Sequence, residues 1–196
     1  MAVEQGGPAP AGPGDPVPAG RDGAVREPLL HGALVTLRPA GPADVPALTA
    51  IRAHPEVRRW WRGGTDLAAE VAADLADPDT PVLAVEHAGR VVGAIQWHAE
   101  DDPDYRHAGI DIFLDPATRG RGLGPDAVRT LARHLIDAYG HHRLTIDPAA
   151  ANVAAIRCYT KVGFRPVGVL RRYERDADGG WQDGLLMDLL AGELVD

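Results

Sequence analysis

The sequence predicts a mixed α/β (α+β) domain with a mostly antiparallel sheet and flanking helices. Short apolar strand patterns alternate with amphipathic helical patterns along the chain, which is typical of this fold class. Strand patterns within 81–99 and within 164–191 are separated by short turns, which favour antiparallel hairpins. In the middle of the chain, residues 108–147 have the strand–helix–strand order of a βαβ-like unit, so we expect one central crossover.

The first part of the chain predicts a tail, one strand and two helices. Residues 1–28 are rich in Pro, Gly and Ala without apolar periodicity, so we expect a disordered tail followed by one domain over 29–196. Residues 33–39 have the pattern of a strand that ends at a proline. Apolar residues at helical spacing predict helices over 41–57 and 66–77.

The rest of the chain predicts the remaining strands and two more helices. In order, these are two strands around a turn at 88–90, a strand over 108–115, a helix over 125–139, a strand over 142–147, a helix over 152–163, and a closing hairpin of 164–176 and 181–191 with its turn at 177–180. Asn152 is a suitable N-cap for the last helix, and Gly163 is a suitable stop.

Charge and composition exclude several classes of function. The net charge is −8, whereas a protein that binds nucleic acid in bulk is normally basic, so no nucleic-acid partner is expected. Cys158 is the only cysteine, so we expect neither a disulfide nor a metal site. The N-terminus lacks the pattern of a secretion signal, and no apolar run is long enough to cross a bilayer. We therefore expect a cytoplasmic protein without a membrane partner, as a monomer or homodimer.

A loop rich in glycine and arginine lies between a predicted strand and a predicted helix. In DPATRGRGLGPDAV, Arg119, Gly122 and Gly124 form the pattern R-x-x-G-x-G. A helix start exposes unpaired N–H groups, glycines let a ligand approach the backbone, and arginines add charge-assisted contacts. The combination predicts an anion cradle, with a simple tight turn as the alternative. The spacing fits neither the dinucleotide fingerprint nor the P-loop.

In this context the loop resembles the acyl-CoA pyrophosphate loop of the GNAT superfamily of N-acetyltransferases. The segment NVAAIRCYTKVGF, residues 152–164, is similar to a later motif of the same superfamily. VRRWWRGG, AGIDIFLDPATRGRGLG, TIDP and AIRCYTKVGF together resemble the aminoglycoside 6′-N-acetyltransferases. RRYERDADGGWQDGLLMDLL is also similar to members that act on proteins or on siderophore precursors. The resemblance extends from about residue 31 to the C-terminus and leaves the tail out.

The resemblance implies a GNAT-like fold whose central crossover binds acyl-CoA, with acetyl-CoA as cosubstrate and no metal. It also implies that backbone N–H groups of strand 108–114 face the thioester carbonyl. The cofactor-binding residues that it implies are Phe113, Leu114, Arg119, Gly120, Arg121, Gly122, Leu123, Gly124 and Asn152.

Two aspartates are candidates for handling an amine. Asp111 interrupts the apolar strand GIDIFL, where a carboxylate is costly unless it is paired or used. The resemblance implies that it acts on the acceptor amine, and a structural contact with Arg106 or His107 is the alternative. Asp147 ends the next predicted strand, so it either holds a cationic acceptor or stabilises the turn before Pro148.

The resemblance implies that Tyr159 is the general acid for the CoA thiolate, with a core aromatic as the alternative. Asn152 either binds the pantetheine arm or only caps its helix. Cys158 lies inside a helix without an activating histidine, which favours a buried, inert thiol.

Other residues are candidates for an acceptor cleft. Trp60 and Trp61 could stack on a sugar ring, although one of a pair is often part of the core. Gln96 and Trp97, with the adjacent His98, end a strand that could line the same cleft. The acidic stretch 100–104 is either a solvated loop or a cleft mouth that steers polycations.

These residues predict an enzyme that moves acetyl directly from acetyl-CoA to a primary amine. Asp111 and Asp147 suit a polycation, so the leading acceptor is the 6′-amine of an aminoglycoside, an antibiotic-resistance activity. The predicted catalytic residues are Asp111 and Tyr159, and the predicted substrate-binding residues are Trp60, Trp61, Gln96, Trp97, Asp111 and Asp147. An amine of a protein N-terminus, a lysine or a siderophore precursor is the alternative acceptor. A non-catalytic acyl-CoA-binding module is the alternative of another class.

Overall fold

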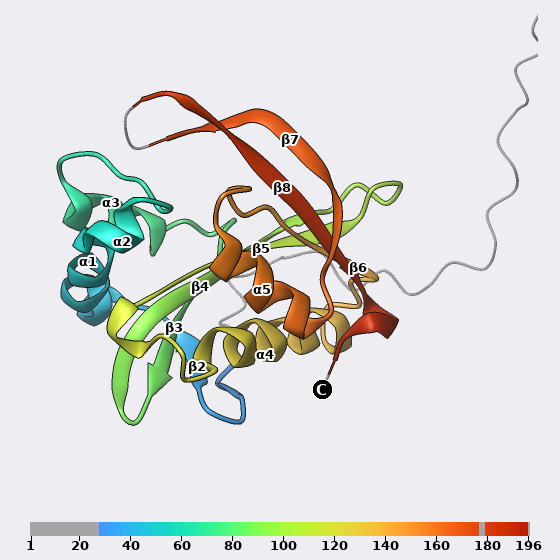
Figure 1. Cartoon of the computed structure of the whole chain (residues 1–196). Helices are drawn as coiled ribbons and strands as arrows, with labels where there is room; N and C mark the ends of the chain where they lie inside the picture. Colours follow the sequence, from blue (N-terminus) through green and yellow to red (C-terminus); the bar gives the residue numbers. More distant parts are fainter. Residues whose placement is uncertain (1–27, 177–178, 196) are drawn as a thin grey trace, which may run out of the picture.

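The computed structural model describes residues 28–176 and 179–195 and confirms the predicted fold class. An eight-stranded sheet has the order β1-β2-β3-β4-β5-β6-β8-β7 (Figure 1). Neighbouring strands are antiparallel except for β5 and β6. The strands are β1 (Leu30–His31), β2 (Thr36–Pro39), β3 (Val82–His87), β4 (Arg90–Glu100), β5 (His107–Leu114), β6 (Arg143–Ile146), β7 (Arg165–Arg175) and β8 (Trp181–Leu190). The predicted tail lies outside the described residues, apart from its last residue.

Helices pack on both faces of the sheet. On one face, α4 (Leu123–Asp137) and α5 (Val153–Val162) bury the main core, which includes Trp97 and Ile110. On the other face, α1 (Val45–Ala53) and α3 (Leu67–Asp74) pack over Ala94 and Phe113. Three short 3₁₀ turns complete the described elements: η1 (Pro42–Asp44), η2 (Pro116–Thr118) and η3 (Ala191–Glu193). None of the helices described is both long and apolar enough to cross a bilayer.

One predicted helix is divided in two. The prediction of a continuous helix over 41–57 is wrong, because α1 ends at Ala53 and α2 (Pro55–Arg58) follows. His54 has the extended backbone angles φ −63° and ψ 130°, since a residue before proline is disfavoured in the α conformation. The break redirects the chain, so that α2 and the loop after it lie at the edge of the cleft described below.

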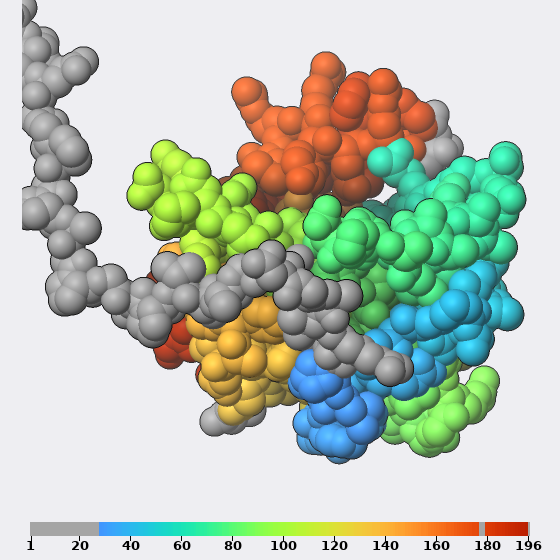
Figure 2. All heavy atoms as spheres, turned by 180° about the vertical axis from the view of Figure 1, so that it is seen from behind, coloured from blue at the N-terminus to red at the C-terminus, as the bar shows by residue number. Residues whose placement is uncertain are grey.

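The β7–β8 hairpin extends beyond its neighbours in the sheet. β7 is an edge strand with mostly exposed residues, and both Val167 and Val169 are exposed. In Figure 1 the hairpin runs from the centre of the sheet toward α2 and α3. Figure 2 shows a hollow between β7, in orange, and the segment around residues 60–70, in teal. Residues 177 and 178 of the predicted turn lie outside the described residues.

Candidate active site

The parallel strands β5 and β6 pair for only two residues and then separate. Their register joins Ala108 to Leu144 and Gly109 to Thr145. After β6, residues 148–150 bond to β8 instead, through Leu185 N–H to Pro148 O and Ala150 N–H to Asp183 O, both at 2.8 Å. From Ile110 onward, β5 therefore has no strand partner on its β6 side. Its backbone groups on that side remain available to a ligand.

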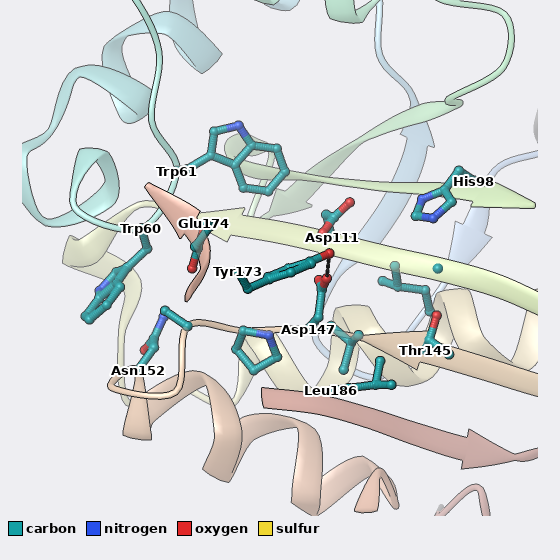
Figure 3. Close-up of a pocket in the computed structure, with 15 residues that line it drawn as sticks. Trp60, Trp61, His98, Asp111, Thr145, Asp147, Asn152, Tyr173, Glu174 and Leu186 are labelled. Atoms are coloured by element: carbon teal, nitrogen blue, oxygen red, sulfur yellow. Dashed lines mark hydrogen bonds between the residues drawn. The ribbon is translucent and has the colours of Figure 1, made fainter. Parts of the chain in front are cut away.

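A cavity of about 390 Å³ opens beside this gap (Figure 3). Its walls come from β4, β5, β6, β7 and β8, from the loop after α2, and from the start of α5. The lining residues are Trp60, Trp61, His98, Gly109, Ile110, Asp111, Thr145, Ile146, Asp147, Pro148, Ala149, Asn152, Tyr173, Glu174 and Leu186.

Asp111 places a carboxylate in the cavity wall. Its strand neighbours Ile110 and Ile112 belong to the core on the opposite face of the sheet, as the alternation predicts. Gln96, directly opposite on β4, donates from Nε2 to Asp111 Oδ2 at 3.4 Å. Burial raises the pKa of Asp111, and the charge of Asp147 raises it further, while Gln96 and His98 act in the opposite sense. A carboxylate with a raised pKa is a better proton acceptor, which suits a general base.

The structural alternative for Asp111 is wrong. Arg106 donates instead to the carbonyl oxygens of Tyr139 and Gly140, at 2.6 and 3.0 Å. The His107 ring nitrogen Nδ1 contacts the carbonyl oxygen of Tyr105 at 2.8 Å. Neither residue neutralises Asp111, so its carboxylate faces the cavity with an amide as its described hydrogen-bond partner.

Asp147 forms a second acidic position that is shared with Tyr173. The Tyr173 hydroxyl on β7 donates to Asp147 Oδ2 at 2.5 Å, and this contact raises the pKa of Tyr173 to about 12. Glu174, the next residue, also lines the cavity, and burial raises its pKa. Figure 3 shows the Asp111 and Asp147 carboxylates pointing toward the Tyr173 hydroxyl. The cavity thus offers three carboxyl groups to a cationic group.

One close approach shapes the His98 side of the cavity. A Cβ at Gly109 would lie 2.2 Å from His98 Cε1, so the imidazole can cross β5 only because that position is glycine. Trp60 and Trp61 form the opposite side, and both are half-buried. Trp61 also packs edge-on against Phe113, with ring centroids 4.8 Å apart. Trp61 thus lines the cavity and also packs against the core, as the alternative for this pair predicts, and stacking on a sugar ring stays a prediction.

The glycine- and arginine-rich loop lies at the start of α4, as predicted. Gly122 is the N-cap, and its φ of 80° is in the left-handed region that favours glycine. Arg119, Gly120, Arg121 and Gly122 are exposed, so the open helix start can receive an anion. The Arg119 guanidinium forms an ion pair with Glu56 on α2. These features fit the diphosphate of acyl-CoA, although the loop does not line the cavity.

A buried aspartate fixes the position of this helix start. Asp126, in the first turn of α4, accepts backbone N–H groups of Ala33, Leu34 and Val35 at 3.1, 2.7 and 3.0 Å. A carboxylate here also suits the positive end of the helix. The turn before β2 is thereby fixed beside the loop, a contact between distant segments that the sequence did not indicate.

Tyr159 lies on α5, and Asn152 caps the start of that helix. Tyr159 is 6% exposed in the main core, and burial raises the pKa of its phenol, to which the charges of Asp111 and Asp147 also contribute. Asn152 lines the cavity, and its side chain accepts Ala155 N–H at 3.2 Å, which confirms the predicted N-cap. Burial raises the pKa of the Cys158 thiol to about 12, in agreement with an inert residue. The catalytic role of Tyr159 and the pantetheine contact of Asn152 stay predictions.

One expectation for the acceptor cleft, a contact by Trp97, is wrong, and two other segments lie outside the cavity lining. Trp97 is fully buried against α4, because alternation along β4 turns it away from the face that carries Gln96 and His98. Gln96 itself contacts Asp111 without lining the cavity. The acidic stretch 100–104 does not line the cavity either, and within it Asp102 N–H bonds to Glu100 and Asp104 N–H to Asp102.

Sequence reasoning missed the contribution of the closing hairpin. Tyr173, Glu174 and Leu186 line the cavity, as does Thr145 on β6. The segment RRYERD has one aromatic residue among charged residues on an edge strand, and nothing in its spacing relates Tyr173 to Asp147. Only the sheet order β6-β8-β7 brings the two together.

The comparisons with known proteins agree with this geometry. The family model for the Acetyltransferase (GNAT) domain matches residues 35–165. The chain is 32% identical over 157 residues to aminoglycoside N(6′)-acetyltransferase type 1 of Klebsiella pneumoniae, which covers 69% of this chain and 76% of that protein. It is 35% identical over 141 residues to a mycothiol acetyltransferase of Nocardia farcinica, which covers 66% of this chain and 45% of that protein. A solved structure of AAC(6′)-Ib in complex with Parmomycin and AcetylCoA is similar with a TM-score of 0.67 and 25% identity, over 82% of this chain and 95% of that one.

The fold, the site and these matches define an acetyltransferase. More particularly, the chain belongs to the GNAT acetyltransferase family, since the family model covers more than half of it. The names of these relatives mention different compounds, an aminoglycoside in one case and mycothiol in the other. Family membership therefore defines the reaction class and leaves the acceptor to the chemistry of the cavity.

Proposed function

We propose that this protein transfers acetyl from acetyl-CoA directly to a primary amine held between Asp111 and Asp147. The observation that carries the proposal is the position of these carboxylates, beside the stretch of β5 that has no partner on its β6 side. An amine in this cavity would lie next to the strand edge that the family resemblance assigns to the thioester.

The amine must lose a proton before it can attack. A primary amine with a lysine-like pKa of about 10.4 is almost wholly protonated at neutral pH. Asp147, with Tyr173 donating to it, attracts the ammonium, and the buried Asp111 accepts its proton. The raised pKa of Asp111 lowers the free-energy cost of this transfer relative to an ordinary aspartate.

The rest of the cleft fits the donor. The start of α4, with Arg119 and Arg121, would hold the diphosphate, and Asn152 would contact the pantetheine arm. When bound, acetyl-CoA supplies the activated acetyl group as a thioester. Tyr159 Oη would donate a proton to the sulfur as the thiolate departs, and a phenol whose pKa is raised by burial stays protonated for this purpose.

The leading acceptor is the 6′-amine of an aminoglycoside, which would make this an antibiotic-resistance enzyme. Three carboxyl groups in one cavity suit a molecule with several amines, and two tryptophans suit a sugar ring. The Klebsiella pneumoniae relative and the AAC(6′)-Ib structure support this acceptor. The amine of a protein N-terminus, a lysine or a siderophore precursor is the alternative, because the cavity residues recognise an amine rather than a whole molecule.

A thiol-release assay tests the proposal. Purified protein with acetyl-CoA and kanamycin should release CoA thiol well above background hydrolysis, and mass spectrometry should find one added acetyl group. Asp111→Asn should lower kcat/KM by about 100-fold, the usual contribution of a general base. Asp104→Asn, which changes an exposed carboxylate outside the cavity, is the matched control and should leave turnover unchanged.

Each negative result has its own meaning. No release with kanamycin but release with other primary amines would reject the aminoglycoside while retaining the reaction. Binding of acetyl-CoA without turnover across a broad amine panel would reject the enzyme in favour of a non-catalytic acyl-CoA-binding module.

A further inference from the structure

A second hollow adjoins the acceptor cavity and has the opposite charge. This groove, of about 810 Å³, lies between α2 with the following loop and the far end of the β7–β8 hairpin. Its lining residues are Ala53, Pro55, Arg58, Arg59, Arg62, Gly63, Asp176 and Gly179. Among the lining residues that the structure describes, three guanidinium groups and one carboxylate are present, in a protein whose net charge is −8. A groove with a net positive charge on an acidic protein favours an anionic ligand.

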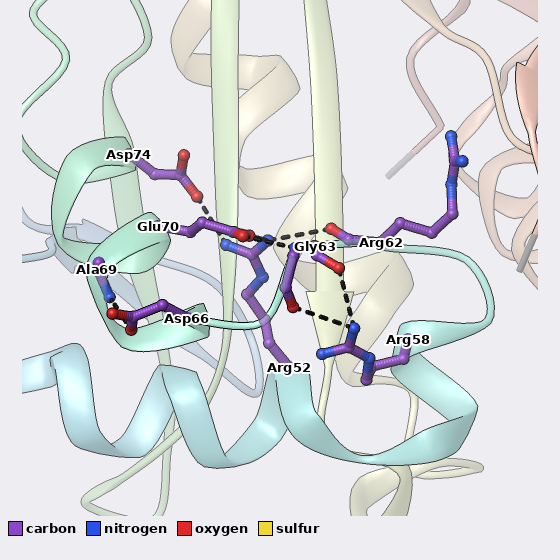
Figure 4. A network of polar contacts seen from close by, with 9 residues as sticks. Arg52, Arg58, Arg62, Gly63, Asp66, Ala69, Glu70 and Asp74 are labelled. Atoms are coloured by element: carbon purple, nitrogen blue, oxygen red, sulfur yellow. Dashed lines mark hydrogen bonds and ion pairs between the residues drawn. The ribbon is translucent and has the colours of Figure 1, made fainter.

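The backbone that carries these arginines is fixed by a polar network (Figure 4). The buried Arg52 donates to Asp74 at 2.8 Å, to Glu70 at 3.3 Å and to the carbonyl oxygen of Arg62 at 3.1 Å. Arg58 donates to the carbonyl oxygens of Gly63 and Gly64 at 2.9 and 3.3 Å. The backbone of the loop is thus held from two sides, which lowers the cost of ordering it when a ligand binds.

Two of the arginines have no carboxylate partner within the described residues. Figure 4 shows the Arg62 side chain extending away from the network, and no hydrogen bond or ion pair joins it to another described residue. The Arg59 guanidinium lies over the Trp60 ring, 4.6 Å from its centroid. Asp176, on the opposite wall, accepts Gly180 N–H at 2.7 Å. Arg59 and Arg62 are therefore the cations with which an incoming anion would pair.

The groove and the acceptor cavity are lined by neighbouring residues of the same loop. Trp60, under the Arg59 guanidinium, lines the cavity, and Arg62 directly follows Trp61. Arg62 also acts electrostatically on Glu174 in the cavity wall, where it opposes the rise in the pKa of that carboxyl. One molecule could thus reach both hollows, with its amine at the carboxylates and another group at the arginines.

We propose that this groove binds an anionic group, a carboxylate or a phosphate, on the acceptor whose amine enters the cavity. The inference rests on the proposed amine acetylation and narrows its substrate class. Guanidinium groups pair with oxyanions in bidentate geometry, whereas they repel a second ammonium. An acceptor with an amine and an oxyanion, such as a peptide with an acidic residue close to its N-terminus, fits both hollows. A purely cationic aminoglycoside fits the cavity alone.

Peptides that share one N-terminal amine provide a direct test. The set is Ala-Asn-Gln-Gly, Ala-Asp-Glu-Gly, Ala-phosphoserine-Gln-Gly and Ala-Arg-Arg-Gly, all as C-terminal amides, with acetylation followed by thiol release. At low salt we expect kcat/KM for the acidic peptides to exceed that of the neutral peptide by about tenfold, and the arginine peptide to be the poorest. The preference should shrink in about 0.5 M salt, since exposed charges are screened. Comparing kcat/KM of the carboxylate peptide with that of the phosphate peptide shows which of the two anionic groups the groove prefers.

The double variant Arg59→Gln/Arg62→Gln should abolish most of the preference while neutral-peptide turnover changes little. Arg90→Gln, at the exposed β3–β4 hairpin, is the matched control and should retain the full preference. Acetylation of every peptide without an acidic preference, or a preference that survives the double variant, would overturn the inference and leave the proposed reaction intact. If no peptide is acetylated, peptides are rejected as acceptors of the proposed reaction. The same peptides labelled at the C-terminus then report on the groove by fluorescence anisotropy with CoA present, and equal binding of acidic and neutral peptides would reject it.

Discussion

The two halves of the cleft are constructed in different ways. The cofactor half is the loop 119–124 with the start of α4, one continuous stretch whose shape follows from a left-handed glycine and an open helix end. The acceptor half is the cavity wall formed by Trp60 and Trp61 with Tyr173 and Glu174, two pairs that are far apart in the sequence. Long-range contacts hold it, chiefly those of Arg52 and the Tyr173–Asp147 bond. The contrast indicates that the backbone shape of the proposed donor loop is encoded within its own segment, whereas the acceptor wall depends on contacts between distant segments.

The largest expected effect lies where the two halves meet. Tyr159→Phe should lower kcat by about 100-fold or more with little change in the KM for acetyl-CoA, because the hydroxyl acts on the departing sulfur in the transition state. Steady-state kinetics with the best acceptor would measure both constants. Unchanged kcat would remove Tyr159 from the reaction and leave it as a core residue.

The next effect should be confined to the cofactor half. Arg119→Ala should raise the KM for acetyl-CoA by about tenfold at low salt and by less at high salt, with the KM for the amine unchanged. Glu56→Gln is the matched control, because it breaks the same ion pair while keeping the guanidinium. Wild-type affinity for CoA in Arg119→Ala, measured by calorimetry, would contradict the assignment of the loop.

A third variant should affect only the acceptor half. Arg52→Met removes the guanidinium that holds the Arg62 carbonyl and leaves Glu70 and Asp74 without it, so the acceptor KM should rise several-fold at constant acetyl-CoA KM. The loss of about 2 kcal/mol of stability should lower Tm by roughly 4–8 °C. Arg52→Lys should restore part of the stability but less of the acceptor KM, because an ammonium cannot span three acceptors as the planar group does. Equal changes in both KM values would show that the halves are not independent.

The smallest effect is a gain of stability in the acceptor half. Asp111→Asn should raise Tm by about 1–4 °C at neutral pH, because the variant no longer buries a charge beside Asp147. The raised pKa means that the folded state binds the Asp111 proton more tightly than the unfolded state. The cost is therefore present at neutral pH and disappears as pH falls from the folded pKa through the ordinary aspartate value. Calorimetry at neutral and acidic pH should show the two proteins converging, and a difference that persists in acid would contradict this origin.

The sequence predicted what local rules determine. Asn152 as an N-cap, Gly163 as a helix end and the turn at Gly122 all follow from backbone preferences within a few residues. Asp111 was predicted to be a site residue because a charged side chain within an apolar strand is unusual. In each case the signal and the structure it predicts lie in the same short segment.

What the sequence could not provide depends on which segments meet. Tyr173 reaches Asp147 only because of the order of the strands in the sheet. Asp126 accepts hydrogen bonds from the turn before β2, which lies about 90 residues earlier in the sequence. Trp97 was assigned to the cleft together with Gln96 and His98, although consecutive residues of a strand cannot share one face. The helix break at His54 could have been predicted from Pro55, because proline disfavours the helical conformation of the preceding residue. The prediction followed the apolar spacing instead.

The short register between β5 and β6 has a mechanical consequence. Only two residue pairs join β1–β5 to the unit formed by β6, β8 and β7, fewer than join β5 to β4 or β6 to β8. Small rotations across it would widen or narrow the gap while few hydrogen bonds are broken. Amide hydrogens on the unpaired side of β5 should accordingly exchange with solvent faster than the β5 amide hydrogens that bond to β4. A ligand bound in the gap should slow this exchange, because it restricts the relative rotation of the two parts of the sheet.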